Sequence, residues 1–88
     1  MENSEKPAKH YRRLCRLLAR ARKAKEITQK ELGQRLGRTQ SCIAKFERGQ
    51  RPMNCLEFLQ ITEIVGADPA RLVRRATREP QEPGSPGH

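Results

Sequence analysis

Aromatic residues are scarce in this sequence, where they make up 3% of the chain and tryptophan is absent. The three aromatic residues are Tyr11, Phe46 and Phe58. Proteins that bind single-stranded nucleic acid stack successive bases on aromatic side chains. The composition therefore argues against a nucleic-acid binder that works by stacking.

Cysteine and histidine are too few and too scattered to indicate a metal site. The cysteines are Cys15, Cys42 and Cys55, none of them in a Cys-x-x-Cys motif, and the histidines are His10 and His88. This spacing fits no zinc site, and three cysteines make a disulfide framework improbable. We expect reduced thiols, no bound metal and no cofactor.

Long apolar runs are also missing, and none approaches the roughly 18 residues that a membrane-spanning helix needs. Residues 1–9 lack the apolar stretch of a signal peptide, so we expect a cytoplasmic protein that makes no use of a membrane. Neither a glycine-rich phosphate loop nor a Ser/His/Asp set is present, and we expect no enzymatic activity.

Positive charge is what the sequence has in excess. Its 88 residues include 19 Lys and Arg against 10 Asp and Glu, a net charge of +9. Residues 12–51 carry 13 basic and 3 acidic residues, whereas residues 53–70 carry 3 acidic residues and no basic one. Four more arginines within residues 71–78 form a second basic group, which either reaches flanking DNA or only adds solubility. A polyanion is therefore the expected partner.

The two ends of the chain differ from its middle. Residues 1–9 are polar, and residues 79–88 hold three of the six prolines. Neither end has apolar residues to bury, so we predict a disordered N-terminal arm and a disordered Pro/Gly-rich tail. The folded domain is then expected to span residues 10–78.

Helical periodicity and helix-ending residues divide this domain into five short helices. Apolar residues recur every three or four positions, and no segment alternates in the manner of a strand. The predicted helices span residues 11–25, 29–36, 40–48, 55–65 and 69–78. The fold class is therefore all-α.

Capping residues support four of these helix starts. Thr28 and Asn54 each stand three residues before a glutamate, which is the pattern of a capping box. Thr39 is the expected N-cap of the third helix. Asp68 is the expected N-cap of the fifth helix, in which Pro69 takes the first helical position.

The last two helices supply both a candidate core and a candidate dimer surface. The fourth helix is expected to bury a broad apolar face made of Leu56, Leu59, Ile61, Ile64 and Val65. In the fifth helix, Leu72 and Val73 either join the core or contribute to a dimer patch.

Residues 29–46 meet the requirements of a helix-turn-helix, in which two short helices are joined by a glycine turn. Gly33 is small where the second helix must cross closely, and Gly37 makes the turn. The apolar anchors of the two helices are Leu32, Leu36, Ile43 and Phe46.

This segment resembles the Cro/repressor-type helix-turn-helix domain of phage repressors and small bacterial regulators, the XRE family. The matching text is ITQKELGQRLGRTQSCIAKFERGQRP followed by LEFLQITEIVGADP, within a resemblance that covers residues 12–74. The resemblance implies a compact, five-helix, lambda-repressor-like domain. It also implies a bacterial or phage-encoded, nucleoid-associated transcriptional repressor that binds double-stranded DNA. A homodimer would place two recognition helices in successive major grooves of a palindromic operator.

The same resemblance assigns the residues of the third helix that face base edges. They are Gln40, Ser41, Ala44 and Lys45. Glutamine can bond both N6 and N7 of adenine, and lysine favours O6 and N7 of guanine. The alternative is that these are solvated side chains, and that Ala44 is only small enough to permit close approach.

Predicted phosphate contacts surround this helix, where helix starts and arginines offer donors to the DNA backbone. They are Thr28, Gln29, Arg38, Thr39, Arg48 and Arg51. The resemblance further implies that Gln29 braces Gln40, and that Arg22 and Glu47 form an ion pair joining the first helix to the third.

Two other functions remain compatible with the sequence. One is an antitoxin-type protein, which binds an operator and also a toxin-like partner protein. The other is a nonspecific nucleic-acid binder that uses charge alone. Cys42, in the first turn of the predicted recognition helix, is either a redox switch or a small half-buried side chain.

Overall fold

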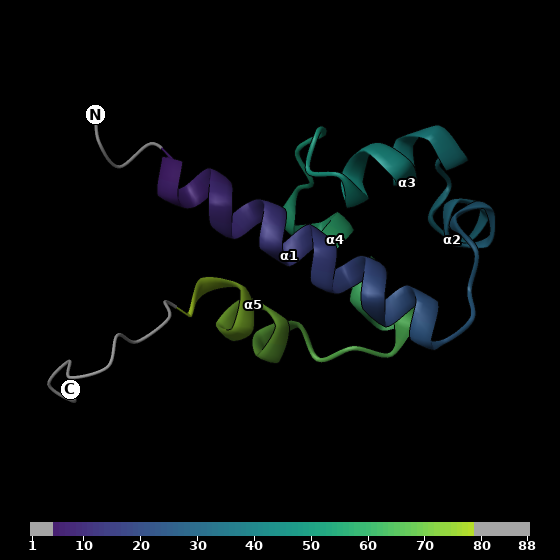
Figure 1. Ribbon diagram of the computed structural model, residues 1–88. Helices are drawn as coiled ribbons and strands as arrows, with labels where there is room; N and C mark the ends of the chain where they lie inside the picture. Colours follow the sequence, from purple (N-terminus) through teal and green to yellow (C-terminus); the bar gives the residue numbers. More distant parts are fainter. Residues whose placement is uncertain (1–4, 79–88) are drawn as a thin grey trace, which may run out of the picture.

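The computed structural model describes residues 5–78, which form five helices around one core (Figure 1). The helices are α1 (Glu5–Ala24), α2 (Gln29–Leu36), α3 (Gln40–Glu47), α4 (Cys55–Val65) and α5 (Pro69–Thr77). The predicted all-α class is confirmed. Within residues 5–78, no helix is both long and apolar enough to cross a membrane. The expected disorder of residues 1–4 and 79–88 lies outside the described residues.

Helix α1 begins at Glu5, six residues before the predicted start at Tyr11. The helix therefore includes residues 5–9, which the sequence analysis placed in a disordered arm. Pro7 does not prevent this, because it lies in the first turn, where a backbone N–H has no helical partner in any case.

The other four helices begin where the capping residues predicted. Thr28 and Asn54 each form a complete capping box with the glutamate three residues on. The hydroxyl of Thr39 accepts from the third backbone N–H of its helix at 3.1 Å, and Asp68 caps α5. These bonds satisfy donors that a helix start otherwise leaves unpaired, which explains why the local sequence predicted where these four helices begin.

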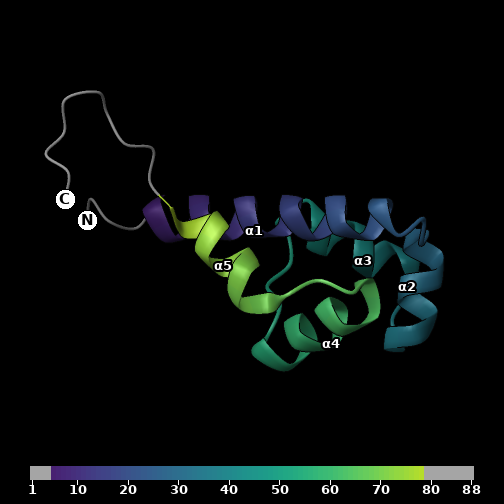
Figure 2. The same cartoon turned by 90° about the horizontal axis from the view of Figure 1, so that it is seen from below.

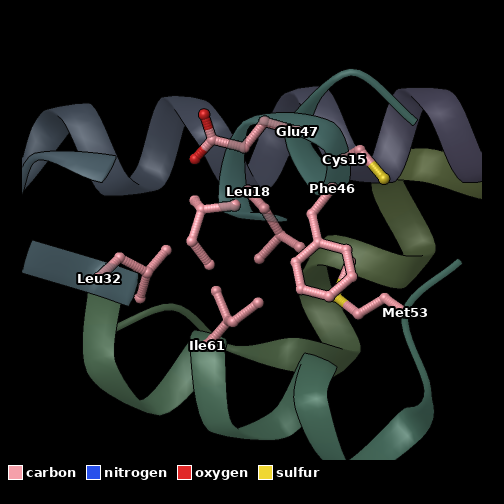
Figure 3. Close-up of a pocket in the computed structure, with 8 residues that line it drawn as sticks. Cys15, Leu18, Leu32, Phe46, Glu47, Met53 and Ile61 are labelled. Carbon is pink, nitrogen blue, oxygen red and sulfur yellow. The ribbon is translucent and has the colours of Figure 1, made fainter. Parts of the chain in front are cut away.

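The core lies where α1, α2, α3 and α4 meet. Figure 2 shows α1 along one edge of the molecule and α4 along the opposite edge, with α2 and α5 at the two ends. Ile43 is fully buried, and Leu32 and Phe46 are nearly so. Figure 3 shows Leu18, Leu32, Phe46 and Ile61 converging on one small apolar cavity between these helices.

Helix α4 buries a narrower face than the sequence predicted. Ile61 and Val65 are buried and Ile64 is half-buried, but Leu56 is 64% exposed and Leu59 is 43% exposed. Residues two apart on a helix point roughly 160° from one another, so Leu59 cannot share the inward direction of Ile61. The five apolar residues span too wide an arc for one contact, and two leucines stay on the surface.

Helix α5 is docked onto α1 by packing and by an arginine. Leu72 and Ala76 are buried, whereas Val73 is exposed. Arg13 of α1 donates to the carbonyl oxygens of Ala76 at 3.0 Å and of Arg78 at 2.9 Å. Its guanidinium thereby satisfies carbonyls at the end of α5 that have no helical partner.

Candidate nucleic-acid interface

Two glycines set the angle between α2 and α3. A Cβ atom at Gly33 would lie 2.6 Å from the carbonyl oxygen of Arg38 and 3.3 Å from that of Thr39. The backbone that leads into α3 therefore approaches α2 as closely as glycine alone permits. Gly37 ends α2 with φ of 76°, a left-handed conformation that side chains disfavour.

Helix α3 buries one side and presents the other to solvent. Ile43 anchors the inner side in the core. Gln40, Ser41 and Lys45 are exposed, and Ala44 is half-buried between the two sides. The outer side thus offers amide, hydroxyl and ammonium groups, the chemistry that pairs with base edges in a major groove.

A buried ion pair ties the end of α3 to α1. Arg22 Nε lies 2.6 Å from Glu47 Oε2, and Arg22 Nη2 donates to Oε1 at 3.1 Å. The two side chains are 8% and 12% exposed. Arg22 also donates to the carbonyl oxygen of Ile27 at 2.7 Å, which fixes the start of the connection to α2. The pair expected between Arg22 and Glu47 is therefore present, with bidentate geometry.

Gln29 takes a different partner from the one the resemblance implied. Its amide donates to Oε1 of Glu47 at 2.9 Å, and it does not brace Gln40. A carboxylate accepts a stronger hydrogen bond than a neutral amide does, and Glu47 lies close to the start of α2. Gln29 therefore helps to hold α3 against α2, and Gln40 is left free on the exposed side.

Arg38, which the sequence predicts to contact the DNA backbone, has a carboxylate partner within the protein. Its guanidinium pairs with Oε2 of Glu57, whose other oxygen accepts the backbone N–H of Asn54 in the capping box. The sequence identified Glu57 only as the partner of Asn54 in the capping box of α4. The pairing neutralises Arg38 and joins the α2–α3 turn to the start of α4.

Arg48 and Arg51 remain available beyond the end of α3. Arg48 is exposed and bonds only to the neutral amide of Gln50, at 3.2 Å. The guanidinium of Arg51 lies 5.8 Å from the centre of the Phe46 ring, within the range of a cation–π contact. Both positive charges therefore keep free donors on the α3 side of the molecule.

Tyr11 holds the loop that carries Arg51, a role that sequence reasoning missed. Its hydroxyl donates to the carbonyl oxygen of Arg51 at 2.6 Å. Burial raises the pKa of Tyr11 well above its usual value, so the hydroxyl keeps its proton and remains a donor. The two residues are 40 positions apart, and no local pattern signals such a contact.

A hollow lies beside the start of α3, next to two of the arginines. It is lined by Gly37, Arg38, Thr39, Cys42 and Arg51. Cys42 is half-buried there, and all three cysteines are free thiols. Burial raises the pKa of Cys15 in the core, which keeps that thiol protonated.

These features define a helix-turn-helix protein, and comparison with known proteins places it in a family. The family described as "Helix-turn-helix domain" matches residues 13–75. A solved structure, the XRE-family like protein from Pseudomonas syringae pv. tomato str. DC3000, is 42% identical with a TM-score of 0.69. The match covers 76% of this chain and 82% of that chain. No curated protein sequence matches significantly.

The chain therefore belongs to the helix-turn-helix domain family, in its XRE-type branch. As a member of that family it is a DNA-binding regulator. The resemblance identified in the sequence is confirmed at this level.

Proposed function

We propose that the protein is a sequence-specific transcriptional regulator that reads the major groove through α3. The observation that carries this proposal is the exposure of Gln40, Ser41 and Lys45 on a helix whose inner side is buried and whose end is held by Arg22. A helix that is already held in place loses little conformational entropy on binding, so its free polar groups can distinguish bases effectively. Ala44, at the edge of the same side, is proposed to contact a thymine methyl group.

Phosphate contacts would position α3 in the groove. The donors proposed on one flank are the hydroxyls of Thr28 and Thr39 and the backbone N–H groups at the starts of α2 and α3, including that of Gln29. On the other flank are Arg48 and Arg51. Both exposed arginines lie just beyond α3, so each can bond the backbone beside the bases that α3 reads.

We further propose that the protein acts as a homodimer, joined through the outer face of α4 and the exposed Val73 of α5. The large exposed apolar residues of the described chain are Leu56, Leu59 and Val73, all on these two helices. Residues 53–70, which include all of α4, contain no basic residue, so two chains of charge +9 repel one another least where α4 meets its counterpart. The α3 helices would stay free to enter half-sites about 34–36 Å apart on a palindromic operator.

Occupancy of such an operator would block RNA polymerase at a promoter in the bacterial cytoplasm, which makes repression the simplest outcome. The action needs binding alone and no catalysis.

Replacing Gln40 with alanine is expected to weaken binding to a preferred duplex by about 1–3 kcal/mol and to change binding to random DNA little. The change removes a base contact and leaves the charge intact. Arg51→Gln is the matched contrast, because it should weaken all sequences alike and lower the salt dependence by about one unit of slope. Fluorescence anisotropy over a salt series measures both. Equal losses on both duplexes for Gln40→Ala would exclude base reading by that residue.

Introducing two charges at the proposed dimer surface, Leu56→Lys with Leu59→Lys, is expected to yield a monomer. Both leucines are exposed, so the fold should tolerate the change while the apolar contact is lost. Ala24→Lys with Gln34→Lys adds the same charge at exposed positions of α1 and α2, outside the proposed surface, and should leave the dimer intact. Analytical ultracentrifugation measures whether the wild type and each of the two variants is a monomer or a dimer. A wild-type protein that is monomeric at the concentrations used for DNA binding would contradict the proposed dimer.

A further inference from the structure

A second basic surface lies where α1 and α5 pack together. Arg13, Arg16 and Arg20 of α1 line a hollow with Arg75 of α5. Arg75 also lines an adjoining hollow with the other arginines at this end of the chain, Arg71, Arg74 and Arg78. These seven residues are here called the arginine surface. All are arginine, the side chain best suited to bidentate contact with phosphate oxygens.

The arginine surface lacks neutralising partners. Within residues 8–78, none of its members is paired with a carboxylate, and Arg13 is the one whose guanidinium bonds to the protein, at the end of α5. Asp68 lines one hollow, but its carboxylate accepts the backbone N–H of Ala70 at 3.1 Å as the cap of α5. Six exposed guanidinium groups therefore keep their donors free beside one another. Such a concentration of like charge is stabilised by binding an anion.

This surface is separate from the side of α3 that is proposed to read DNA. In Figure 1, α3 and α5 lie on opposite sides of α1, and they make no contact with each other. Each helix packs inward by one face, so the outward faces of α3 and α5 point in different directions. A duplex seated on α3 therefore leaves the arginine surface uncovered.

We propose that the arginine surface binds the phosphate backbone of a second DNA duplex, so that the protein bridges two DNA segments. The proposal builds on the proposed function, since α3 holds the first duplex. Side chains three and four apart on a helix are neighbours, about 5–6 Å between Cβ atoms, so α1 presents Arg16 and Arg20 as a row. A row continued by the arginines of α5 fits a chain of phosphates better than a single small anion. It carries no base-reading groups, so it is indifferent to sequence.

The test is a bridging assay with the wild type and two charge-matched variants. One duplex is attached to beads, protein is bound, and retention of a second, labelled duplex is measured. The surface variant is Arg16→Gln with Arg20→Gln and Arg75→Gln. The control is Lys23→Gln with Lys25→Gln and Arg35→Gln, which removes the same charge from exposed positions outside the arginine surface. The surface variant should retain at least about tenfold less second duplex than the wild type, and the control should retain nearly as much as the wild type.

A second measurement on the same proteins separates this proposal from the proposed function. Anisotropy with one short duplex should give the surface variant the affinity and salt slope of the control. A lower slope than the control would mean that the arginines contact the duplex already held by α3, and the bridging proposal would be wrong. Bridging that persists in the surface variant would also overturn it, since the two α3 helices of a dimer would then suffice. Lys45→Ala tests the proposed function separately, because Lys45 lies on α3 and outside the arginine surface. We expect it to weaken binding to a single duplex, whatever the result of the bridging assay.

Discussion

Replacing Arg22 with methionine is expected to lower the free energy of unfolding by about 3–5 kcal/mol. The substitution leaves the carboxylate of Glu47, which is 12% exposed, with Gln29 as its remaining partner. It also removes the donor to the carbonyl oxygen of Ile27. Domains of this kind are stable by only about 5–15 kcal/mol, so much of the stability would be lost. Urea unfolding followed by circular dichroism measures the change.

The double variant Arg22→Met with Glu47→Met is the control for this result. It removes both charges and replaces a buried pair with apolar groups of similar length, a change that is often close to neutral. We therefore expect the double variant to recover much of the stability that the single variant loses. A loss below about 1 kcal/mol for Arg22→Met would contradict the prediction, because that is the contribution of an exposed pair.

Replacing Gly33 with alanine is expected to weaken DNA binding at least about tenfold, or about 1.4 kcal/mol, besides destabilising the fold. The added Cβ would lie 2.6 Å from the carbonyl oxygen of Arg38, which is backbone and cannot rotate away. The turn into α3 must shift, and overpacking of this kind costs typically about 1–3 kcal/mol. Because α3 follows that turn directly, a shift of the turn moves the exposed side of α3. That side would then no longer be aligned with Arg48 and Arg51, the proposed phosphate contacts.

Gly37→Ala is the matched control for Gly33→Ala. Gly37 has φ of 76°, and a Cβ placed there meets no atom within 4 Å. Alanine at Gly37 is strained by about 1–2 kcal/mol but displaces nothing. It should therefore lower the unfolding temperature while α3 keeps its place and DNA affinity changes little. Anisotropy and thermal unfolding on both variants compare the two. Equal DNA affinity for both variants, each measured while folded, would show that close packing at Gly33 does not set the position of α3.

The sequence predicted what depends on neighbouring residues. The caps at Thr28, Thr39 and Asn54 involve partners three residues away, and all three are present in the structure. The close approach at Gly33 was also predictable, because a helix-turn-helix has one geometry for its crossing. The start of α1 was not, because a proline within the first helical turn looks the same in sequence as one that precedes a helix.

Contacts between distant residues were beyond the reach of local patterns. The sequence near Gln29 does not indicate its hydrogen-bond partner, because Glu47 lies 18 residues along the chain and reaches Gln29 only in the folded protein. The pairing of Arg38 with Glu57 depends equally on where α4 lies. The exposure of Leu59 depends on which side of α4 meets the core, and a wide apolar arc leaves that undecided. The roles proposed for Gln40, Ser41, Ala44 and Lys45 stay predictions, since they depend on a duplex.

The most direct test of sequence-specific recognition through α3 is selection from a pool of random duplexes, followed by anisotropy on the selected sequence and a shuffled version of equal length. At physiological salt we expect one enriched palindromic sequence, bound about a thousandfold or more tightly than its shuffled counterpart. Gln40→Ala should remove much of that preference. No enrichment, with equal and steeply salt-dependent binding to both duplexes, would contradict base reading by α3 and leave charge as the basis of binding.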